Sequence, residues 1–231
     1  MKNQKMYRLL LLLLLLLISS ITFAQNKFND KGERSGIWRG HHDNGAVKYE
    51  GKFIDGKEIG LFKYYDYSGN LVIRLDYLEP GLRSRAEVYY SSGLIKSRGE
   101  YVNKEKKGLW IYYNLDGKII AEENFDSNNL NGECKYFYDN GRLSEKYIYS
   151  HNKKEGEAEI YYPSGYLNMK CNYHLDKLHG VAEFYYDKTN QLESQGLYTL
   201  GLQDSIWVFY NELGDTLDLY DYVNRRSLMI E

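Results

Sequence analysis

The sequence of 231 residues predicts an all-β protein, an elongated single antiparallel sheet of about eight tandem hairpins of 24 residues, preceded by a signal helix. Three observations support this: a fixed period of glycines and aromatic residues, alternation of apolar and polar residues within each period, and no sustained helical apolar period after the leader. An aromatic content of 16% excludes collagen-like and disordered classes. A net charge of −2 argues against nucleic-acid binding.

The first 24 residues predict an export leader. Lys2, Lys5 and Arg8 precede an apolar run from Leu9 to Ile18, and cleavage is expected between Ala24 and Gln25. That run is shorter than the roughly 20 residues that span a bilayer, and retention of the leader as an uncleaved anchor stays open. Cleavage leaves 27 basic and 32 acidic residues in a secreted, periplasmic or envelope-associated chain.

One period governs the rest of the chain. Each unit begins at an anchor residue, and these anchors are Gly36, Gly60, Ser84, Gly108, Gly132, Gly156, Gly180 and Ser205. Nine positions after the anchor (+9) every unit has glycine except the seventh, where one extra residue in the turn 187–190 shifts the equivalent position to Asn190. With the same shift, position +17 is aromatic in every unit. Turns such as Asn140-Gly141 are strong hairpin signals. The predicted divisions are a leader (1–24), an N-terminal cap (25–35), a repeat domain (36–222) and a C-terminal tail (223–231). The units are 36–59, 60–83, 84–107, 108–131, 132–155, 156–179, 180–204 and 205–222.

Alternation along the strands predicts one apolar and one polar face. We expect positions +2, +4, +11 and +17 to share the apolar face, with Val47, Leu71, Ile95, Ile119, Leu143 and Leu167 at +11. This requires an even-length loop, because an odd loop reverses the return strand. The candidate binding residues of the apolar face are Trp38, Phe62, Trp110, Trp207, Phe53, Tyr77, Tyr101 and Phe125. The same geometry leaves a row of rings at +5 on the polar face: Tyr65, Tyr89, Tyr113, Phe137, Tyr161, Tyr185 and Tyr210. This row is expected either to pack between hairpins or to bind a ligand.

The segment Tyr49 to Gly60, YEGKFIDGKEIG, resembles the MORN repeat. Ser97 to Trp110 repeats the pattern with Lys104 in place of the middle glycine, and Tyr161 to Gly165 is similar to the variant form found in bacterial exported proteins. The +15 glycine is present only as Gly51, Gly99 and Gly196. The resemblance implies an elongated antiparallel sheet used as a scaffold, associated with membranes or protein partners, and some bacterial relatives are called antitoxins.

Searches for catalytic chemistry find nothing recognisable. Cys134 and Cys171 are expected three strands apart, about 14 Å at ~4.8 Å per strand, too far for a disulfide. The histidines are His41, His42, His151, His174 and His179, and they form no zinc pattern. There is no phosphate loop, nucleophile elbow or paired-carboxylate signature that stands out from a charged sheet face. No cofactor and no metal site is expected.

The leading hypothesis is therefore a non-enzymatic repeat scaffold that covers its apolar face with a protein partner or a second copy. A glycan-binding module that uses the +5 ring row is the alternative. Membrane-surface binding fits the family but not the acidic balance, and an enzyme ranks last.

Overall fold

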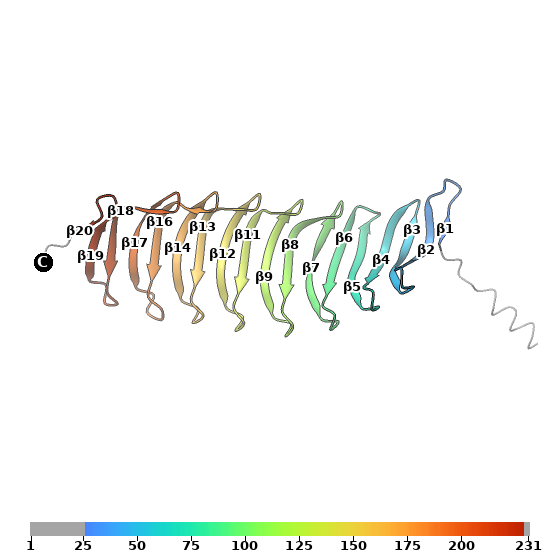
Figure 1. Ribbon diagram of the computed structural model, residues 1–231, viewed down its shortest axis with the longest axis horizontal. Coiled ribbons are helices and arrows are strands. Elements are labelled where there is room, and N and C mark those ends of the chain that lie inside the picture. The colour runs from blue at the N-terminus through green and yellow to red at the C-terminus, as the bar shows by residue number, and fades with distance from the viewer. Residues whose placement is uncertain (1–25, 229–231) are drawn as a thin grey trace, which may run out of the picture.

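The computed structural model describes residues 26–228, which form a single open layer of antiparallel strands (Figure 1). The predicted leader and its cleavage site, and the last three residues, lie outside the described residues. Sixteen strands have six to nine residues: β2 (Arg34–His41), β3 (Val47–Ile54), β4 (Lys57–Tyr65), β5 (Leu71–Glu79), β6 (Arg83–Tyr89), β7 (Ile95–Val102), β8 (Glu105–Tyr113), β9 (Ile119–Asp126), β11 (Gly132–Phe137), β12 (Leu143–Ser150), β13 (Lys153–Tyr161), β14 (Leu167–His174), β16 (Gly180–Tyr185), β17 (Leu192–Thr199), β18 (Leu202–Tyr210) and β19 (Thr216–Asp221). Four strands have two residues: β1 (Lys27–Phe28), β10 (Asn129–Leu130), β15 (Lys177–Leu178) and β20 (Arg226–Ser227).

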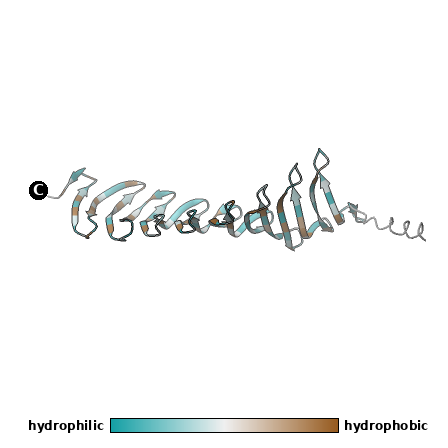
Figure 2. Ribbon diagram, turned by 90° about the horizontal axis from the view of Figure 1, so that it is seen from below, coloured by the Kyte–Doolittle hydropathy of each residue, from teal (hydrophilic) through white to brown (hydrophobic). Residues whose placement is uncertain are grey.

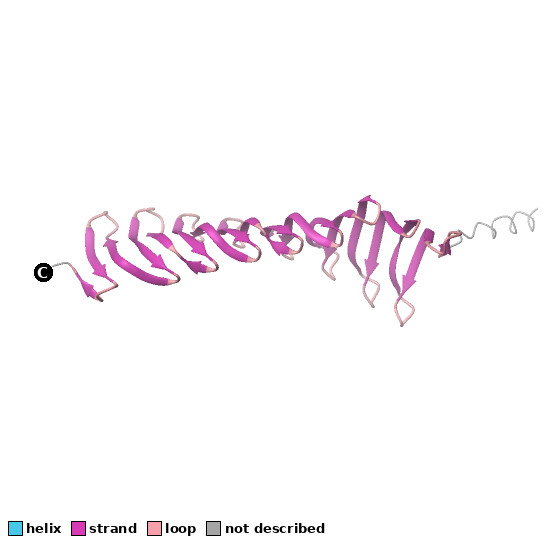
Figure 3. Ribbon diagram, turned by 90° about the horizontal axis from the view of Figure 1, so that it is seen from above, coloured by secondary structure: helices cyan, strands magenta, loops and turns pink. Residues whose placement is uncertain are grey.

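The strands follow one another in the sheet as they do in the chain. β2 pairs with β3, β3 with β4, and so on to β19, and the short strands β10 and β15 extend β11 and β16. Over residues 26–228 there is no helix, and so none that could cross a lipid bilayer. The predicted all-β single sheet is confirmed. The layer twists along its length, as seen from its edge (Figure 3).

The hairpin loop has an odd length, so the predicted even loop is wrong. In the first hairpin the His42 amide donates to the Ala46 carbonyl, and the three residues between them end in Gly45 at φ 83°. This is a type I turn closed by a left-handed glycine, a common three-residue hairpin loop. The seventh unit has four residues between Tyr186 and Gln191, which accommodates its one extra residue.

A β-bulge in the return strand then changes which face its side chains occupy, so that it offsets the effect of the odd loop. His41 pairs with Val47 and Gly40 with Tyr49, so Lys48 at +12 has no partner in the ladder. The same shift recurs between Tyr64 and Tyr65 and at the corresponding place in the other hairpins. Position +11 therefore lies opposite +5 on the polar face, which corrects our placement of Val47, Leu71, Ile95, Ile119, Leu143 and Leu167. The bulge carries +13, +15 and +17 onto the apolar face instead.

We define the apolar face by positions +2, +4, +13, +15 and +17, and the polar face by +3, +5, +11, +14 and +16. Figure 2 shows the resulting alternation of hydrophobic and hydrophilic residues along the strands. Both core clusters lie on the apolar face, one around Trp38, Phe53 and Phe62 and the other from Tyr147 to Trp207. Cys134 and Cys171 are buried there as free thiols, on β11 and β14, as the strand count predicts.

Neighbouring units are also joined at both long edges of the sheet. At one edge, the Tyr138 hydroxyl donates to the Tyr161 carbonyl at 2.6 Å, and Tyr90, Tyr162 and Tyr186 make the same bond to the next unit. At the other edge, the Asn128 amide donates to the Lys106 carbonyl while its side-chain oxygen accepts from the Lys106 amide. These bonds satisfy backbone groups that the ends of the strands would otherwise leave to solvent.

Candidate functional site

The large rings at +2 form the core of the apolar face rather than its surface. Phe62, Trp110 and Trp207 are each 1% exposed and Trp38 is 8% exposed. The Trp110 and Trp207 indole N–H groups each donate to a backbone carbonyl at 3.2 Å. A buried ring with its N–H group satisfied is typical of a packing residue. The candidate binding residues in this row are thus brought together by the fold, but they lie beneath the accessible surface.

Each +2 residue packs against the +15 residue of the preceding unit, and the two are matched in size. A β-carbon built on Gly99 would lie 2.4–2.6 Å from three ring atoms of Trp110, and Gly51 and Gly196 stand in the same relation to Phe62 and Trp207. Where +15 is larger, the facing residue is small. The pairs along the chain are Gly51 with Phe62, Leu75 with Ala86, Gly99 with Trp110, Glu123 with Cys134, Tyr147 with Ala158, Cys171 with Ala182 and Gly196 with Trp207. The missing glycines are therefore compensated within this chain.

The accessible layer of the apolar face is a band of half-buried side chains at +4 and +17. Tyr77, Tyr101 and Phe125 belong to it, whereas Phe53 is only 3% exposed. Edge-to-face contacts hold the band on the core, including Tyr101 on Trp110 at 5.0 Å between ring centroids. Burial raises the pKa of Tyr101 and, together with Glu58, that of Tyr77, so both phenols are neutral hydrogen-bond donors at pH 7.

Three cations lie over rings of the apolar face, most of them in its core. Arg34 covers Trp38 and Phe53, Lys106 lies 4.7 Å from Trp110 and 4.6 Å from Phe125, and Lys154 lies 3.3 Å from Tyr147. Burial lowers the pKa of both lysines. Their aliphatic stems cover apolar surface while the charged ends interact with the ring faces. The chain thus shields part of its own apolar face.

The ring row at +5 lies on the polar face, as the alternation predicts. The Tyr89, Tyr161 and Tyr185 hydroxyls donate to the glutamate two residues before each of them, at 2.6–2.8 Å. The Tyr65 hydroxyl donates to Glu50 at 2.8 Å and, with Arg39, lowers the pKa of that carboxyl. Burial and these bonds raise the pKa values of Tyr65, Tyr161 and Tyr185 to about 12.

The other members of the row lack such a carboxylate bond. Tyr210 accepts from Gln195, Arg98 lies over the Tyr113 ring at 5.5 Å, and Phe137 has no hydroxyl. All seven rings are half-buried. The row is thus largely cross-strand packing, with ring surfaces partly accessible to solvent.

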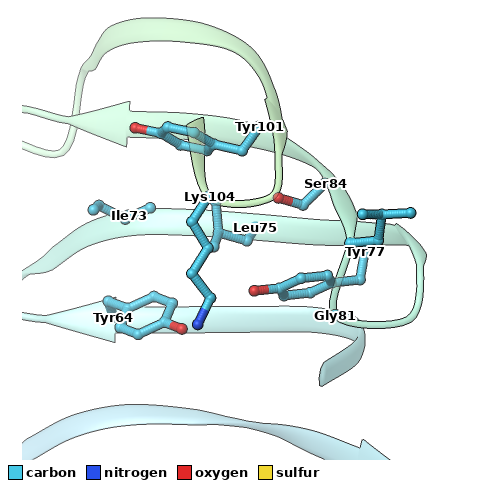
Figure 4. Close-up of a pocket in the computed structure, with 9 residues that line it drawn as sticks. Tyr64, Ile73, Leu75, Tyr77, Gly81, Ser84, Tyr101 and Lys104 are labelled. Atoms are coloured by element: carbon cyan, nitrogen blue, oxygen red, sulfur yellow. The ribbon is translucent and has the colours of Figure 1, made fainter. Parts of the chain in front are cut away.

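A hollow of about 220 Å³ opens in the apolar face over β4 to β7. Its wall is lined by the rings of Tyr64, Tyr77 and Tyr101, with Lys104 reaching across it (Figure 4). The rest of the lining is formed by three aliphatic side chains and two small residues: Ile73, Leu75, Leu82, Gly81 and Ser84. Of these nine residues, the sequence analysis proposed only Tyr77 and Tyr101 as candidate binding residues. Two features of the sequence could have pointed to this place. The third unit has the small residues Ser84 and Ala86 on its first strand, and Lys104 replaces the middle glycine of the repeat pattern.

The histidines lie apart from this hollow. His41, His151, His174 and His179 are exposed, and the His42 ring bonds the Tyr65 carbonyl through Nε2 at 2.9 Å. Within residues 26–228 no three His, Cys, Asp or Glu side chains are grouped so that they could hold a metal ion.

Taken together, these features define a class of protein: a single-layer β-sheet built by tandem repetition, in which each unit contacts its neighbours along one axis. The MORN repeat variant family matches three consecutive segments, 106–127, 130–151 and 154–174. The chain therefore carries variant MORN repeats, and the predicted resemblance is confirmed.

Comparison with solved structures finds low overall similarity. The chain is similar to a crystal structure of TarM, with 13% identity over 41% of this chain and 19% of that one and a TM-score of 0.32. A mutant TarM from S. aureus, in complex with fondaparinux, α-GlcNAc-glycerol and UDP, has 12% identity, the same TM-score, and 42% and 19% coverage. A TcdB2-TccC3-TEV structure has 8% identity over 84% of this chain and 13% of that one, with a TM-score of 0.25. The chain spans less than a fifth of the length of each. No curated protein matches it significantly.

Proposed function

We propose that the chain is an exported, non-enzymatic scaffold of the cell envelope whose apolar face binds a protein partner or a second copy. MORN repeats indicate a repeat scaffold for protein or membrane interaction. The observation that supports a protein contact is the half-buried aromatic band, which runs along one side of the sheet, with no second layer over it within residues 26–228. Tyrosine and tryptophan are enriched at protein interfaces, and monomers rarely expose long apolar bands.

Charge favours a protein contact over a membrane surface. After removal of the leader, the chain has 27 basic against 32 acidic residues. Binding to anionic lipid depends on clustered basic residues. Of the cations on the apolar face, Arg34, Lys106 and Lys154 are spaced along the sheet and already lie on rings, and Lys104 is a single further charge. The face therefore suits an amphipathic protein surface better than a lipid headgroup layer.

The experiment is light scattering of the chain beginning at Gln25, combined with binding of a hydrophobic dye. We expect an assembly larger than one chain that dissociates in Phe184→Lys, because the new charge lies in the +4 band. Val181→Lys is the matched control, since Val181 is 51% exposed on the polar face of the same strand, β16. A monomer in light scattering would contradict self-association, and the absence of dye binding by that monomer would contradict an uncovered apolar face.

Export has its own test. Mass spectrometry of the protein recovered from envelope fractions is expected to give Gln25 as the first residue. Recovery of the intact leader from the soluble cytoplasmic fraction contradicts the proposed location.

Glycan binding through the polar ring row is the second candidate, supported by seven half-exposed rings spaced along one face. If the row binds polysaccharide, replacing Tyr89, Tyr113 and Tyr161 together by alanine abolishes retention on a polysaccharide column. Unchanged retention rejects this candidate.

A further inference from the structure

Several departures from the repeat lie at one place in the sheet. In the tight turns that join one hairpin to the next, the second left-handed residue is Gly56, Asn128, Asn152, Asp176 or Gly201, but between β7 and β8 it is Lys104, at φ 66°. Between β5 and β6 this turn is replaced by Glu79-Pro80-Gly81-Leu82. Ser84 stands where most units have an anchor glycine. Lys104, Gly81, Leu82 and Ser84 all line the same hollow.

Both central residues of these turns are left-handed along the chain, including Leu175 and Leu200 at the first position, so this conformation belongs to the turn rather than to lysine. What sets Lys104 apart from the residues at the second position of the other turns is its long cationic side chain. This side chain lies over an otherwise apolar depression (Figure 4).

The first strand of the third unit, β6, contributes only small side chains to this part of the apolar face. Ser84, 2% exposed, lines the hollow, and Ala86, also 2% exposed, is at the +2 position where the flanking units have Phe62 and Trp110. Ile73 and Leu75 supply an aliphatic surface, and Leu82, 40% exposed, lies at the rim. An apolar cavity of about 150 Å³ can hold one benzene ring, whereas pockets for drug-sized ligands begin near 300 Å³. A volume of about 220 Å³ therefore suits a single ring or a short branched chain.

The charges around the hollow give it a polarity. Lys104 makes no ion pair among the described side chains, and its ammonium lies on the Tyr64 side (Figure 4). The Glu58 carboxylate lies beside Gly81, 3.4 Å from where a β-carbon on that glycine would lie. Burial, and then Glu58, raise the pKa of Tyr64 and of Tyr77, so their phenols can donate hydrogen bonds. An anionic group is therefore favoured beside the Lys104 ammonium and disfavoured beside Glu58.

We propose that this hollow binds a small monocarboxylate with one apolar ring or short branched chain. Its carboxylate pairs with Lys104 and accepts from the Tyr64 hydroxyl, and its apolar part packs on Ile73 and Leu75. Binding at this site needs neither a partner nor export, but the hollow opens in the same apolar face that the scaffold proposal assigns to a partner.

In the experiment, the full chain beginning at Gln25 is titrated with phenylacetate. Binding is measured by calorimetry and by the NMR chemical shifts of the tyrosine rings. Phenylacetamide, which has the same shape without the charge, is the ligand control. The variant is Lys104→Asn. Two other turns already have asparagine at this position, Asn128 and Asn152, so the substitution should preserve the fold. Lys188→Asn is the matched control, because Lys188 is also left-handed, at φ 72°, but lies in the distant turn after β16.

We expect saturable, millimolar binding of phenylacetate with shifts confined to Tyr64, Tyr77 and Tyr101. Lys104→Asn should weaken it about fivefold, the upper range for a partly exposed ion pair, and Lys188→Asn should not change it. Leu82→Trp, which fills the hollow from its rim, should abolish binding while unfolding at the same denaturant concentration. Absence of saturable binding, equal affinity for phenylacetamide, or unchanged binding in Leu82→Trp overturns the proposal.

Discussion

The size matching between +15 and +2 leads to a prediction about Gly99 and Trp110. Gly99→Leu places a large side chain where a single β-carbon would already lie 2.4 Å from the Trp110 ring. Trp110→Ala empties a position that is 1% exposed. Made together, the two substitutions introduce the residue types of the Leu75 and Ala86 pair, which face each other across β5 and β6, at a place where the β7–β8 register is irregular. We expect the double variant to recover part of the stability that each single variant loses.

The magnitudes follow from the two kinds of damage. Removing a buried tryptophan side chain costs about 3–5 kcal/mol, through lost burial and a residual cavity. Overpacking a filled site costs about 1–3 kcal/mol. If the pair acts as one packing unit, the double variant should lose less unfolding free energy than the two single variants lose together. The difference should be about 1–3 kcal/mol.

The assay is urea unfolding followed by far-ultraviolet circular dichroism, which does not depend on the tryptophan that is removed. Ser97→Ala is the control, because Ser97 lies two residues earlier on β7, is 5% exposed on the same face, and loses volume without creating a clash. Additive losses in Gly99→Leu and Trp110→Ala refute the reasoning, and so does a Gly99→Ala variant as stable as the parent.

Three further predictions concern stability and reactivity. The phenols of Tyr65, Tyr161 and Tyr185 have folded pKa values of about 12 against an ordinary 10, so their contribution is complete below pH 10 and is lost as the pH rises toward 12. Melting temperatures between pH 8 and 12 should fall less steeply when all three are phenylalanine, as Phe137 already is, and an unchanged slope contradicts this. Tyr138→Phe should lower the unfolding free energy by about 0.5–1.5 kcal/mol by removing its bond to the Tyr161 carbonyl, whereas Tyr166→Phe, at an exposed turn residue, should not. Cys134 and Cys171 are 0% and 1% exposed, and burial raises the pKa of both thiols, that of Cys171 to about 11. A thiol reagent should therefore label them only at the rate of unfolding, and rapid labelling of native protein contradicts their placement.

The period, the hairpins and the single layer could be predicted because each rests on local chemistry. Asn140-Gly141 selects a tight turn whatever surrounds it, and the alternation of apolar with charged residues assigns most of each strand to a face. The bulge at +12 could not be predicted in this way. Apolar residues occupy both +11 and +13 in several units, such as Leu71 and Ile73, so the alternation fits either phase of the return strand.

The binding features depended on contacts between units. From the sequence, Trp38 and Trp110 were expected to be exposed binding residues of the apolar face, because a single-layer sheet offers no obvious place to bury an indole. Their burial depends on a glycine in a neighbouring strand and on cationic side chains that fold over the rings. The Lys104 departure was visible beforehand, but the hollow beneath it depends on Ser84, Tyr64 and Tyr77 meeting across three strands.

The matched seams between units also restrict how such a chain can evolve. Tandem arrays of near-identical modules usually lengthen or shorten by recombination, since any module fits beside any other. Here a module with Tyr147 at +15 needs a small +2 residue such as alanine in the next module, and one with Gly196 at +15 leaves a void unless a large ring follows at +2. Duplication of the module 60–83 would set Leu75 against a second Phe62, and duplication of 108–131 would set Glu123 against a second Trp110, whereas a second copy of 156–179 would repeat the existing cysteine and alanine contact. The seams therefore restrict which modules can be copied.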